Sequence, residues 1–161
     1  MSTATPSADD SRPILVVPDS RGRLKSWHCW REQPYWKEFV SLCTQNTQPE
    51  HVEYLKRKGI KTITTGLEHV DYRRALEELG GRFGICVVRV DSGGTLNGVL
   101  LRAGLVDEIH LLVHPTLVGA INPNTFFRDP DKEQAGDIPL KFLNSELHSE
   151  MCLLLSYAVM K

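Results

Sequence analysis

Short apolar runs alternate with amphipathic helical segments along much of the chain, and this alternation limits the folds open to it. Residues 14–17 form a continuous apolar run that stops at Pro18, as expected for a strand buried on both faces. Residues 60–64 are predicted as a further strand, and residues 37–43 as another with a weaker signal. Strands that alternate with helices predict a largely parallel sheet with helices on both faces.

Three helices are predicted from their start and stop signals. Residues 47–50 (Thr-Gln-Pro-Glu) read as a capping box with Thr47 as N-cap, so the first helix is expected to run to Lys58 and stop at Gly59. Asp71 is expected to cap the second helix, which the glycine pair 80–81 would end. The third helix is expected to open at the glycine pair 93–94 and end at Gly104.

The last third of the chain carries strand signals without helices between them. Residues 109–118 read as a long strand, and a loop rich in Asn, Pro and Asp follows it. Residues 140–147 and 151–159 alternate well enough for an antiparallel hairpin that turns near Ser149. We therefore expect the sheet to finish in an antiparallel arrangement.

Composition narrows the class of protein. With 161 residues the chain is expected to hold one domain over residues 12–161, preceded by a disordered polar tail, residues 1–11. A formal charge of −1 argues against a broad nucleic-acid or membrane-surface footprint, and the apolar runs are too short to span a bilayer. No apolar segment of a secretory signal is present, and four widely spread cysteines predict reduced, mostly buried thiols in a cytoplasmic protein.

The segment with the most chemical content is residues 85–97. A β-branched strand, residues 85–90, is expected to run into Asp91 and Ser92, and the glycine pair then opens a helix. Unpaired amides at a helix start attract a phosphate or pyrophosphate, and glycine lets a ligand approach the backbone. A tight connection in which Asp91 and Ser92 merely cap the helix accounts for the pattern equally well. The segment is not the GxGxxG fingerprint of a standard dinucleotide-binding fold.

Several motifs together resemble one family. Residues 91–97 (Asp-Ser-Gly-Gly-Thr-Leu-Asn), 103–108 (Ala-Gly-Leu-Val-Asp-Glu) and 115–119 (Pro-Thr-Leu-Val-Gly) follow the pattern of the reductase domain of riboflavin biosynthesis, a member of the dihydrofolate-reductase-like superfamily. Residues 12–23 resemble that family's strand and Asp-Ser-Arg turn, so the resemblance covers about residues 12–160. It implies an α/β fold: a three-layer α/β/α mixed sheet, mainly parallel, with antiparallel C-terminal strands.

The resemblance also implies an activity and its binding residues. The family uses NADPH to reduce the ribose of a 5-amino-6-(5-phosphoribosylamino)pyrimidine to a ribityl chain. Its acid before the glycines, usually glutamate, contacts the substrate, and Asp91 stands at that position here. The resemblance identifies no catalytic residue. The cofactor contacts that it implies are Ser20, Gly93, Gly94, Thr95, Leu96, Asn97, Gly98 and Val99.

Family members begin with a further stretch of about half a domain, and nothing in this sequence matches it. We therefore expect either a fragment of a longer reductase or a shortened relative. The resemblance implies a homodimer with a small pyrimidine nucleotide as substrate. A related reductase with another substrate, and a non-catalytic nucleotide-binding or assembly domain, are the alternatives.

Other residues invite functional interpretations with simpler rivals. His110 and His114 would lie about 13 Å apart along a strand, so we expect no shared metal. Cys86 is expected to be an inert thiol within a buried strand. The aromatic residues between positions 27 and 36 are expected to pack beneath a loop rather than stack on a ligand. The basic side chains Arg21, Arg23 and Lys25 either help to bind a 2′-phosphate or form a solvated loop.

Overall fold

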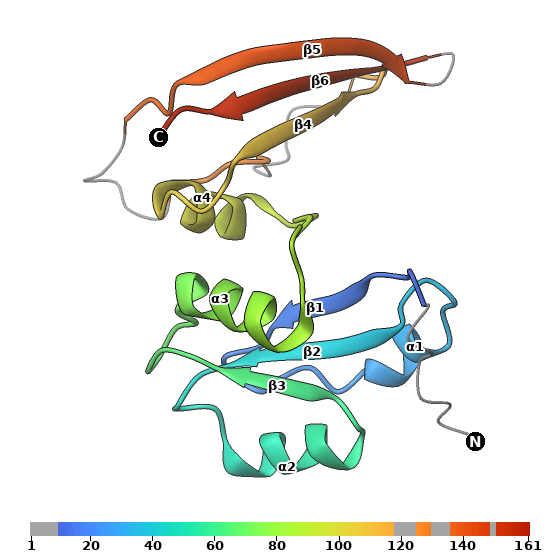
Figure 1. Ribbon diagram of the computed structural model, residues 1–161, viewed down its shortest axis with the longest axis vertical. Coiled ribbons are helices and arrows are strands. Elements are labelled where there is room, and N and C mark those ends of the chain that lie inside the picture. The colour runs from blue at the N-terminus through green and yellow to red at the C-terminus, as the bar shows by residue number, and fades with distance from the viewer. Residues whose placement is uncertain (1–9, 118–124, 130–135, 149–150) are drawn as a thin grey trace. The chain divides into compact units, whose positions relative to one another are not determined.

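The computed structural model describes residues 10–117, 125–129, 136–148 and 151–161 (Figure 1). The chain divides into two compact units, Met1–Cys86 and Val87–Lys161, and each is described by itself. None of the helices in the described ranges has the length and apolar character that a membrane span requires.

The first unit is built on a three-stranded parallel sheet in the order β1-β2-β3. The strands are β1 (Ile14–Pro18), β2 (Glu38–Cys43) and β3 (Lys61–Thr64). The central strand β2 pairs with both neighbours, with Val40 opposite Val16 and Leu42 opposite Ile63. The helices of this unit are α1 (Trp27–Arg31), α2 (Pro49–Arg57) and α3 (Tyr72–Phe83).

Both faces of β2 are buried, because alternate side chains enter two different cores. Val40 and Leu42 pack with Ala75 and Leu79 of α3 on one face. The other face carries Phe39 and Cys43, which pack with Trp27, Leu55 and Ile60. Figure 1 accordingly shows α2 and α3 on opposite sides of the sheet, so this unit has the predicted three layers.

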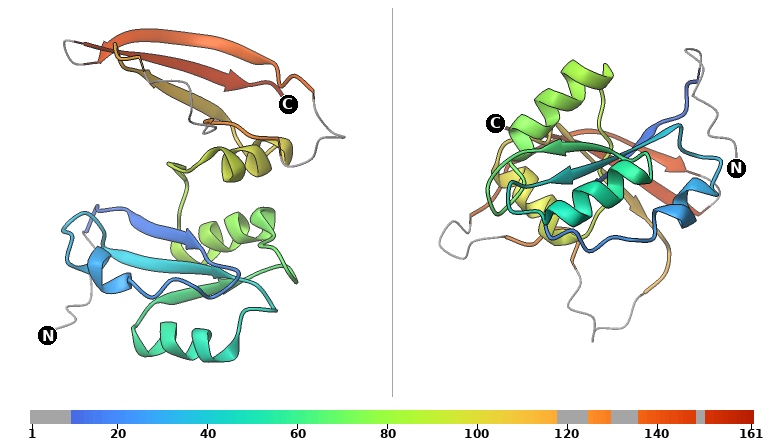
Figure 2. Two further views of the ribbon diagram at one scale, coloured as in Figure 1. Left: turned by 180° about the vertical axis from the view of Figure 1, so that it is seen from behind. Right: turned by 90° about the horizontal axis from the view of Figure 1, so that it is seen from below.

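The second unit joins one helix to a three-stranded antiparallel sheet in the order β4-β6-β5. Its elements are α4 (Gly94–Arg102), β4 (Glu108–Val113), β5 (Leu140–His148) and β6 (Cys152–Val159). The central strand β6 pairs along its length with β4 and β5, as the left view in Figure 2 also indicates. The predicted hairpin is confirmed, and its turn near Ser149 lies outside the described residues.

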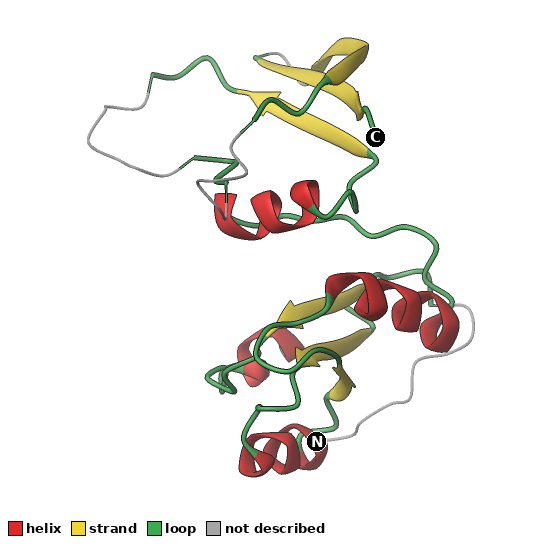
Figure 3. Cartoon of the chain, turned by 90° about the vertical axis from the view of Figure 1, so that its left-hand side faces the viewer, coloured by secondary structure: helices red, strands yellow, loops and turns green. Residues whose placement is uncertain are grey.

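The α/β class, with its parallel and antiparallel parts, is confirmed, but the described strands form two sheets rather than one mixed sheet. The predicted strand over residues 85–90 is wrong: residues 84–93 are irregular and drawn as loop in Figure 3. A β-branched run favours a strand only where a neighbouring strand completes the hydrogen-bond ladder. No strand in the described part of the chain pairs with residues 85–90.

Three predicted boundaries also change. The N-cap of α2 is Gln48 rather than Thr47; the Thr47 hydroxyl instead accepts the Thr44 amide and donates to the Ser20 carbonyl. Helix α3 continues through the glycine pair 80–81 and ends at Gly84, which adopts the left-handed conformation (φ 65°). Strand β4 ends at Val113, whereas the prediction extended to position 118, which the structure does not describe.

The predicted cap of α3 is confirmed. The Asp71 carboxylate accepts a hydrogen bond from the Arg74 amide at 3.2 Å, so one unpaired donor of the helix start is satisfied locally.

Candidate functional site

The start of α4 presents backbone amides without a side-chain cap. Gly93 is the N-cap residue, with extended backbone angles (φ −78°, ψ 166°), and its carbonyl accepts a hydrogen bond from the Asn97 amide. No side chain in the described ranges caps this helix. The helix dipole and the remaining first-turn amides therefore favour an anion at this end.

A loop far along the chain covers one side of this helix start. The Arg128 amide donates to the Gly94 carbonyl at 2.9 Å, and the Asn97 side-chain amide donates to the Phe126 carbonyl at 2.7 Å. An ion pair between Arg102 and Asp129, both half-buried, holds the loop at the other end of the helix. Residues 125–129 are thereby fixed against α4.

The helix start and this loop enclose a cavity of about 380 Å³, a volume within the range of small-molecule sites. Its lining residues supply backbone amides, two threonine hydroxyl groups and one arginine, which are groups that can bind phosphate oxygens. The lining residues are Gly93, Gly94, Thr95, Leu96, Thr125 and Arg128.

The two glycines of this turn have different reasons to be glycine. A Cβ atom at position 94 would lie 2.3 Å from the Thr125 carbonyl oxygen, so the loop could not approach a larger residue. A Cβ at position 93 would meet no protein atom within 4 Å. Space beside Gly93 is thus open to a ligand, whereas Gly94 is needed for packing.

Asp91 lies in the irregular segment before the helix and not at the end of a strand. Its carboxylate pairs with Arg89 at 3.0 Å, and its side chain is 73% exposed. The alternative in which Asp91 caps the helix is wrong, since Gly93 is the N-cap. Ser92 does hold the turn, because its hydroxyl donates to the Asn97 side-chain oxygen at 2.8 Å.

The predicted cofactor residues divide into three groups. Gly93 through Leu96 line the cavity, and Asn97 braces its walls through Ser92 and Phe126. Gly98 is buried and Val99 half-buried, and neither lines the cavity. Ser20 belongs to the first unit, where it follows β1 and its carbonyl accepts from the Thr47 hydroxyl at 2.9 Å.

Three of the four aromatic residues between positions 27 and 36 pack as predicted. Trp27 is 1% exposed and meets Trp30 and Phe39 edge to face, at centroid distances of 5.4 Å and 6.4 Å. Tyr35 is exposed. The three basic residues of the loop after β1 are also exposed, which leaves both of their interpretations open; they are Arg21, Arg23 and Lys25.

The cysteine prediction is half right. Cys43 and Cys152 are buried, and burial raises the pKa of the Cys43 thiol above its usual value. Cys86 is exposed, because the strand that was expected to bury it is not formed. Cys29 is exposed too. All four are free thiols.

His110 and His114 do not share a strand. His110 lies in β4, with its Nδ1 atom 3.0 Å from the Ser156 hydroxyl and its Nε2 atom 3.2 Å from Glu108. His114 follows the end of β4. In the part of the chain that the structure describes, no cluster of three or more potential metal ligands occurs.

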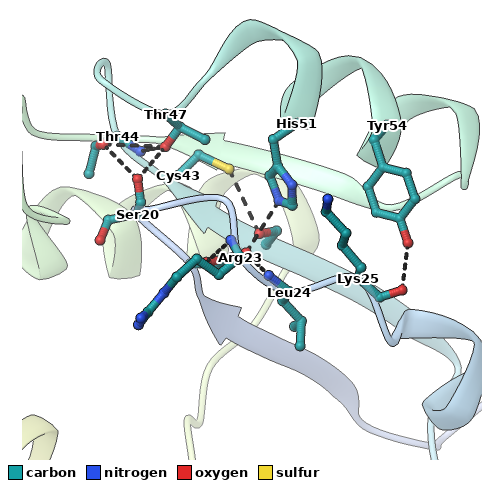
Figure 4. A network of polar contacts seen from close by, with 11 residues as sticks. Ser20, Arg23, Leu24, Lys25, Cys43, Thr44, Thr47, His51 and Tyr54 are labelled. Atoms are coloured by element: carbon teal, nitrogen blue, oxygen red, sulfur yellow. Dashed lines mark hydrogen bonds and ion pairs between the residues drawn. The ribbon is translucent and has the colours of Figure 1, made fainter.

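Sequence reasoning missed several residues of these sites. Thr125 and Arg128 lie in a loop without a motif, and only the fold brings them to α4. In the first unit, the Nε2 atom of buried His51, labelled in Figure 4, lies 3.2 Å from the buried carboxylate of Asp19. Asp19 stands in the Asp-Ser-Arg turn of the family resemblance, but nothing in the sequence around His51 indicated this contact.

Comparisons with known proteins agree with this architecture. The family model of the RibD C-terminal domain matches residues 2–154. A 2,5-diamino-6-ribosylamino-4(3H)-pyrimidinone 5′-phosphate reductase from Methanothermobacter thermautotrophicus is 35% identical over 125 residues, covering 74% of this chain and 53% of the relative. A reductase of the same name from Aquifex aeolicus is 37% identical over 86 residues, covering 53% of this chain and 38% of the relative.

A solved structure shows the same fold. A pyrimidine reductase-like protein from Corynebacterium diphtheriae superposes with a TM-score of 0.73 at 14% identity, over 92% of this chain and 62% of that one. The chain spans about half or less of the length of the two curated relatives. Because the family model matches nearly the whole chain, the chain belongs to the RibD C-terminal domain family.

Proposed function

We propose that this chain supplies the reductase function of riboflavin biosynthesis, with NADPH as the reductant. The substrate is a 5-amino-6-(5-phosphoribosylamino)pyrimidine or the 2,5-diamino form for which the two relatives are named. Family membership supports the reaction class. The observation that carries the proposal is the cavity at the start of α4, where open space beside Gly93 meets uncapped amides and Arg128.

The cavity fits a phosphate-bearing cofactor. Amides at the start of α4 can donate to phosphate oxygens, and the Arg128 guanidinium can neutralise their charge. When bound, NADPH would supply the hydride that reduces C1′ of the ribosyl group, while the C1′–O bond opens and the released ring oxygen takes up a proton to give the ribityl chain. The chain's own residues bind and orient the reactants, and in this proposal the Asp91 carboxylate accepts hydrogen bonds from the substrate.

The first test is NADPH binding by the purified chain, followed through nicotinamide fluorescence. Arg128→Gln is expected to raise the Kd about tenfold or more, because a charge-assisted contact to phosphate contributes roughly 1.5–3 kcal/mol. Arg82→Gln, which removes an exposed arginine paired with Glu78 on α3, is the charge-matched control and should leave the Kd unchanged. Equal losses in both variants would indicate a net-charge effect and count against the site.

The second test concerns Asp91. Asp91→Asn is expected to lower kcat/KM by about five- to 150-fold, equivalent to roughly 1–3 kcal/mol, because one acceptor becomes a donor toward the substrate. Thermal stability and NADPH affinity should stay near parent values, since an exposed ion pair stabilises little. Turnover is measured by the loss of reduced-nicotinamide absorbance with each pyrimidine.

Arg89→Gln is the matched control, because it removes the same ion pair and leaves the carboxylate. If both substitutions lower turnover equally, the pair orders the segment and Asp91 does not contact the substrate. A chain that binds NADPH but oxidises it with neither pyrimidine would support the alternative of a non-catalytic nucleotide-binding or assembly domain.

We also propose that the chain forms a homodimer in the cytoplasm, as the family resemblance implies. Large apolar side chains are exposed on the antiparallel sheet, which supports association with another protein surface. Those exposed on its strands are Leu112, Val113, Leu140, Phe142, Leu143, Leu147 and Leu153. Sedimentation equilibrium measures the mass of the particle in solution: twice the 18.2 kDa of one chain would support the homodimer, and the mass of one chain would contradict it.

A further inference from the structure

The loop that follows β1 is held from within by the carboxylate of Asp19. One carboxylate oxygen accepts the Arg23 amide at 2.9 Å, and the other accepts the Leu24 amide at 2.8 Å. The Asp19 amide in turn donates to the Leu42 carbonyl of β2 at 2.9 Å. A single buried side chain thus closes residues 19–24 into one turn at the carboxyl end of the sheet.

Helix α2 places a histidine against this carboxylate. The His51 Nε2 atom lies 3.2 Å from Asp19, and only 4% of the His51 side chain and 9% of the Asp19 side chain are exposed. The imidazole also packs directly on Gly22, where a Cβ atom would lie 2.8 Å from the ring. Gly22 has φ 62°, so glycine is required there for the backbone and for the contact.

A third contact holds Ser20 itself. The Thr47 hydroxyl donates to the Ser20 carbonyl at 2.9 Å, and the Thr44 hydroxyl lies 3.4 Å from the same atom. In Figure 4 these contacts reach the Ser20 carbonyl, while the Ser20 hydroxyl points away from the two threonines. The backbone of Ser20 is therefore anchored, whereas its hydroxyl makes no hydrogen bond to the residues that the structure describes.

We propose that His51 is a positioning residue for cofactor binding: with Thr47, it fixes the Asp19–Leu24 loop and thereby the Ser20 hydroxyl. The inference rests on the proposed function, because the family resemblance implies that Ser20 contacts the NADPH cofactor. A buried carboxylate that loses a polar partner must relax toward water, and the loop that it organises would relax with it. His51 acts through Asp19 and the loop backbone, without touching the cofactor.

NADPH titration of the full chain tests this role. His51→Leu is expected to raise the Kd about tenfold, equivalent to roughly 1.4 kcal/mol, whereas His51→Gln, which keeps a polar side chain beside the Asp19 carboxylate, should stay within about threefold of the parent. Thr47→Val removes the hydroxyl at nearly constant volume and is expected to raise the Kd severalfold by an independent route. Thr47→Val also keeps the test decisive if His51→Leu fails to fold.

Leu55→Ala is the matched control on the same helix. Leu55 is fully buried in the core on that face of the sheet and is not part of the polar contacts around the loop. This variant should lower the melting temperature and leave the Kd unchanged at a temperature where every variant is folded. If Leu55→Ala loses as much NADPH affinity as His51→Leu, the effect of His51 on the Kd is explained by general destabilisation, and the proposal is overturned.

Amide hydrogen exchange supplies a readout that does not depend on NADPH. The Arg23 and Leu24 amides should exchange faster in folded His51→Leu and Thr47→Val than in the parent, and should not change in Leu55→Ala. Unchanged exchange, or NADPH affinity equal to the parent in both variants, overturns the inference. A parent chain that does not bind NADPH overturns the proposed function instead, and the exchange rates still decide whether His51 holds the loop.

Discussion

Trp27→Ala is expected to lower the free energy of unfolding by about 3–5 kcal/mol, the usual cost of removing a large aromatic side chain from a core. Trp27 is almost completely buried and meets Trp30 and Phe39 edge to face, so its removal leaves a cavity between α1 and β2. Urea denaturation followed by circular dichroism measures the loss.

Tyr35→Ala is the control for Trp27→Ala. Tyr35 belongs to the same aromatic-rich stretch but is 63% exposed, so the free energy of unfolding should change by less than about 0.5 kcal/mol. Unchanged stability in Trp27→Ala together with a loss of NADPH binding would contradict the packing role and indicate stacking on a ligand.

Gly94→Val is expected to impair both the second unit and its cavity. The new Cβ would lie 2.3 Å from the Thr125 carbonyl oxygen, and backbone cannot yield as the end of a side chain can. Overpacking of this kind costs typically about 1–3 kcal/mol. Because the displaced loop carries Arg128, we expect a lower melting temperature and a Kd for NADPH raised at least tenfold, equivalent to roughly 1.4 kcal/mol.

Gly93→Ala separates ligand space from packing. Its Cβ meets no protein atom within 4 Å and its φ is −78°, so the chain should fold, at a cost of about 1 kcal/mol because alanine is a poorer N-cap than glycine. A weaker NADPH affinity in this variant, at near-parent stability, would locate the cofactor beside Gly93. If Gly94→Val retains the parent's melting temperature and affinity, the loop does not lie against α4 as described.

Local signals in the sequence were enough to predict most elements. The apolar runs at β1 and β2, the hairpin of β5 and β6, and the Asp71 cap of α3 all depend on neighbours in the chain or on burial of their own faces. The glycine pair before α4 likewise indicated the helix start correctly. The motifs around it were sufficient to indicate the family.

Tertiary structure alone decided the features that depend on a distant partner. Residues 85–90 have strand-forming side chains but no paired strand in the described ranges. Thr47 does not cap α2 as predicted, and its hydroxyl donates a hydrogen bond to the Ser20 carbonyl. Arg128 reaches the helix start, and His51 reaches Asp19, across 34 and 32 positions of the chain. Propensity and periodicity describe a residue and its near neighbours. A hydrogen-bond ladder between strands, a cavity wall or a buried polar contact exists only when folding brings two separate segments together.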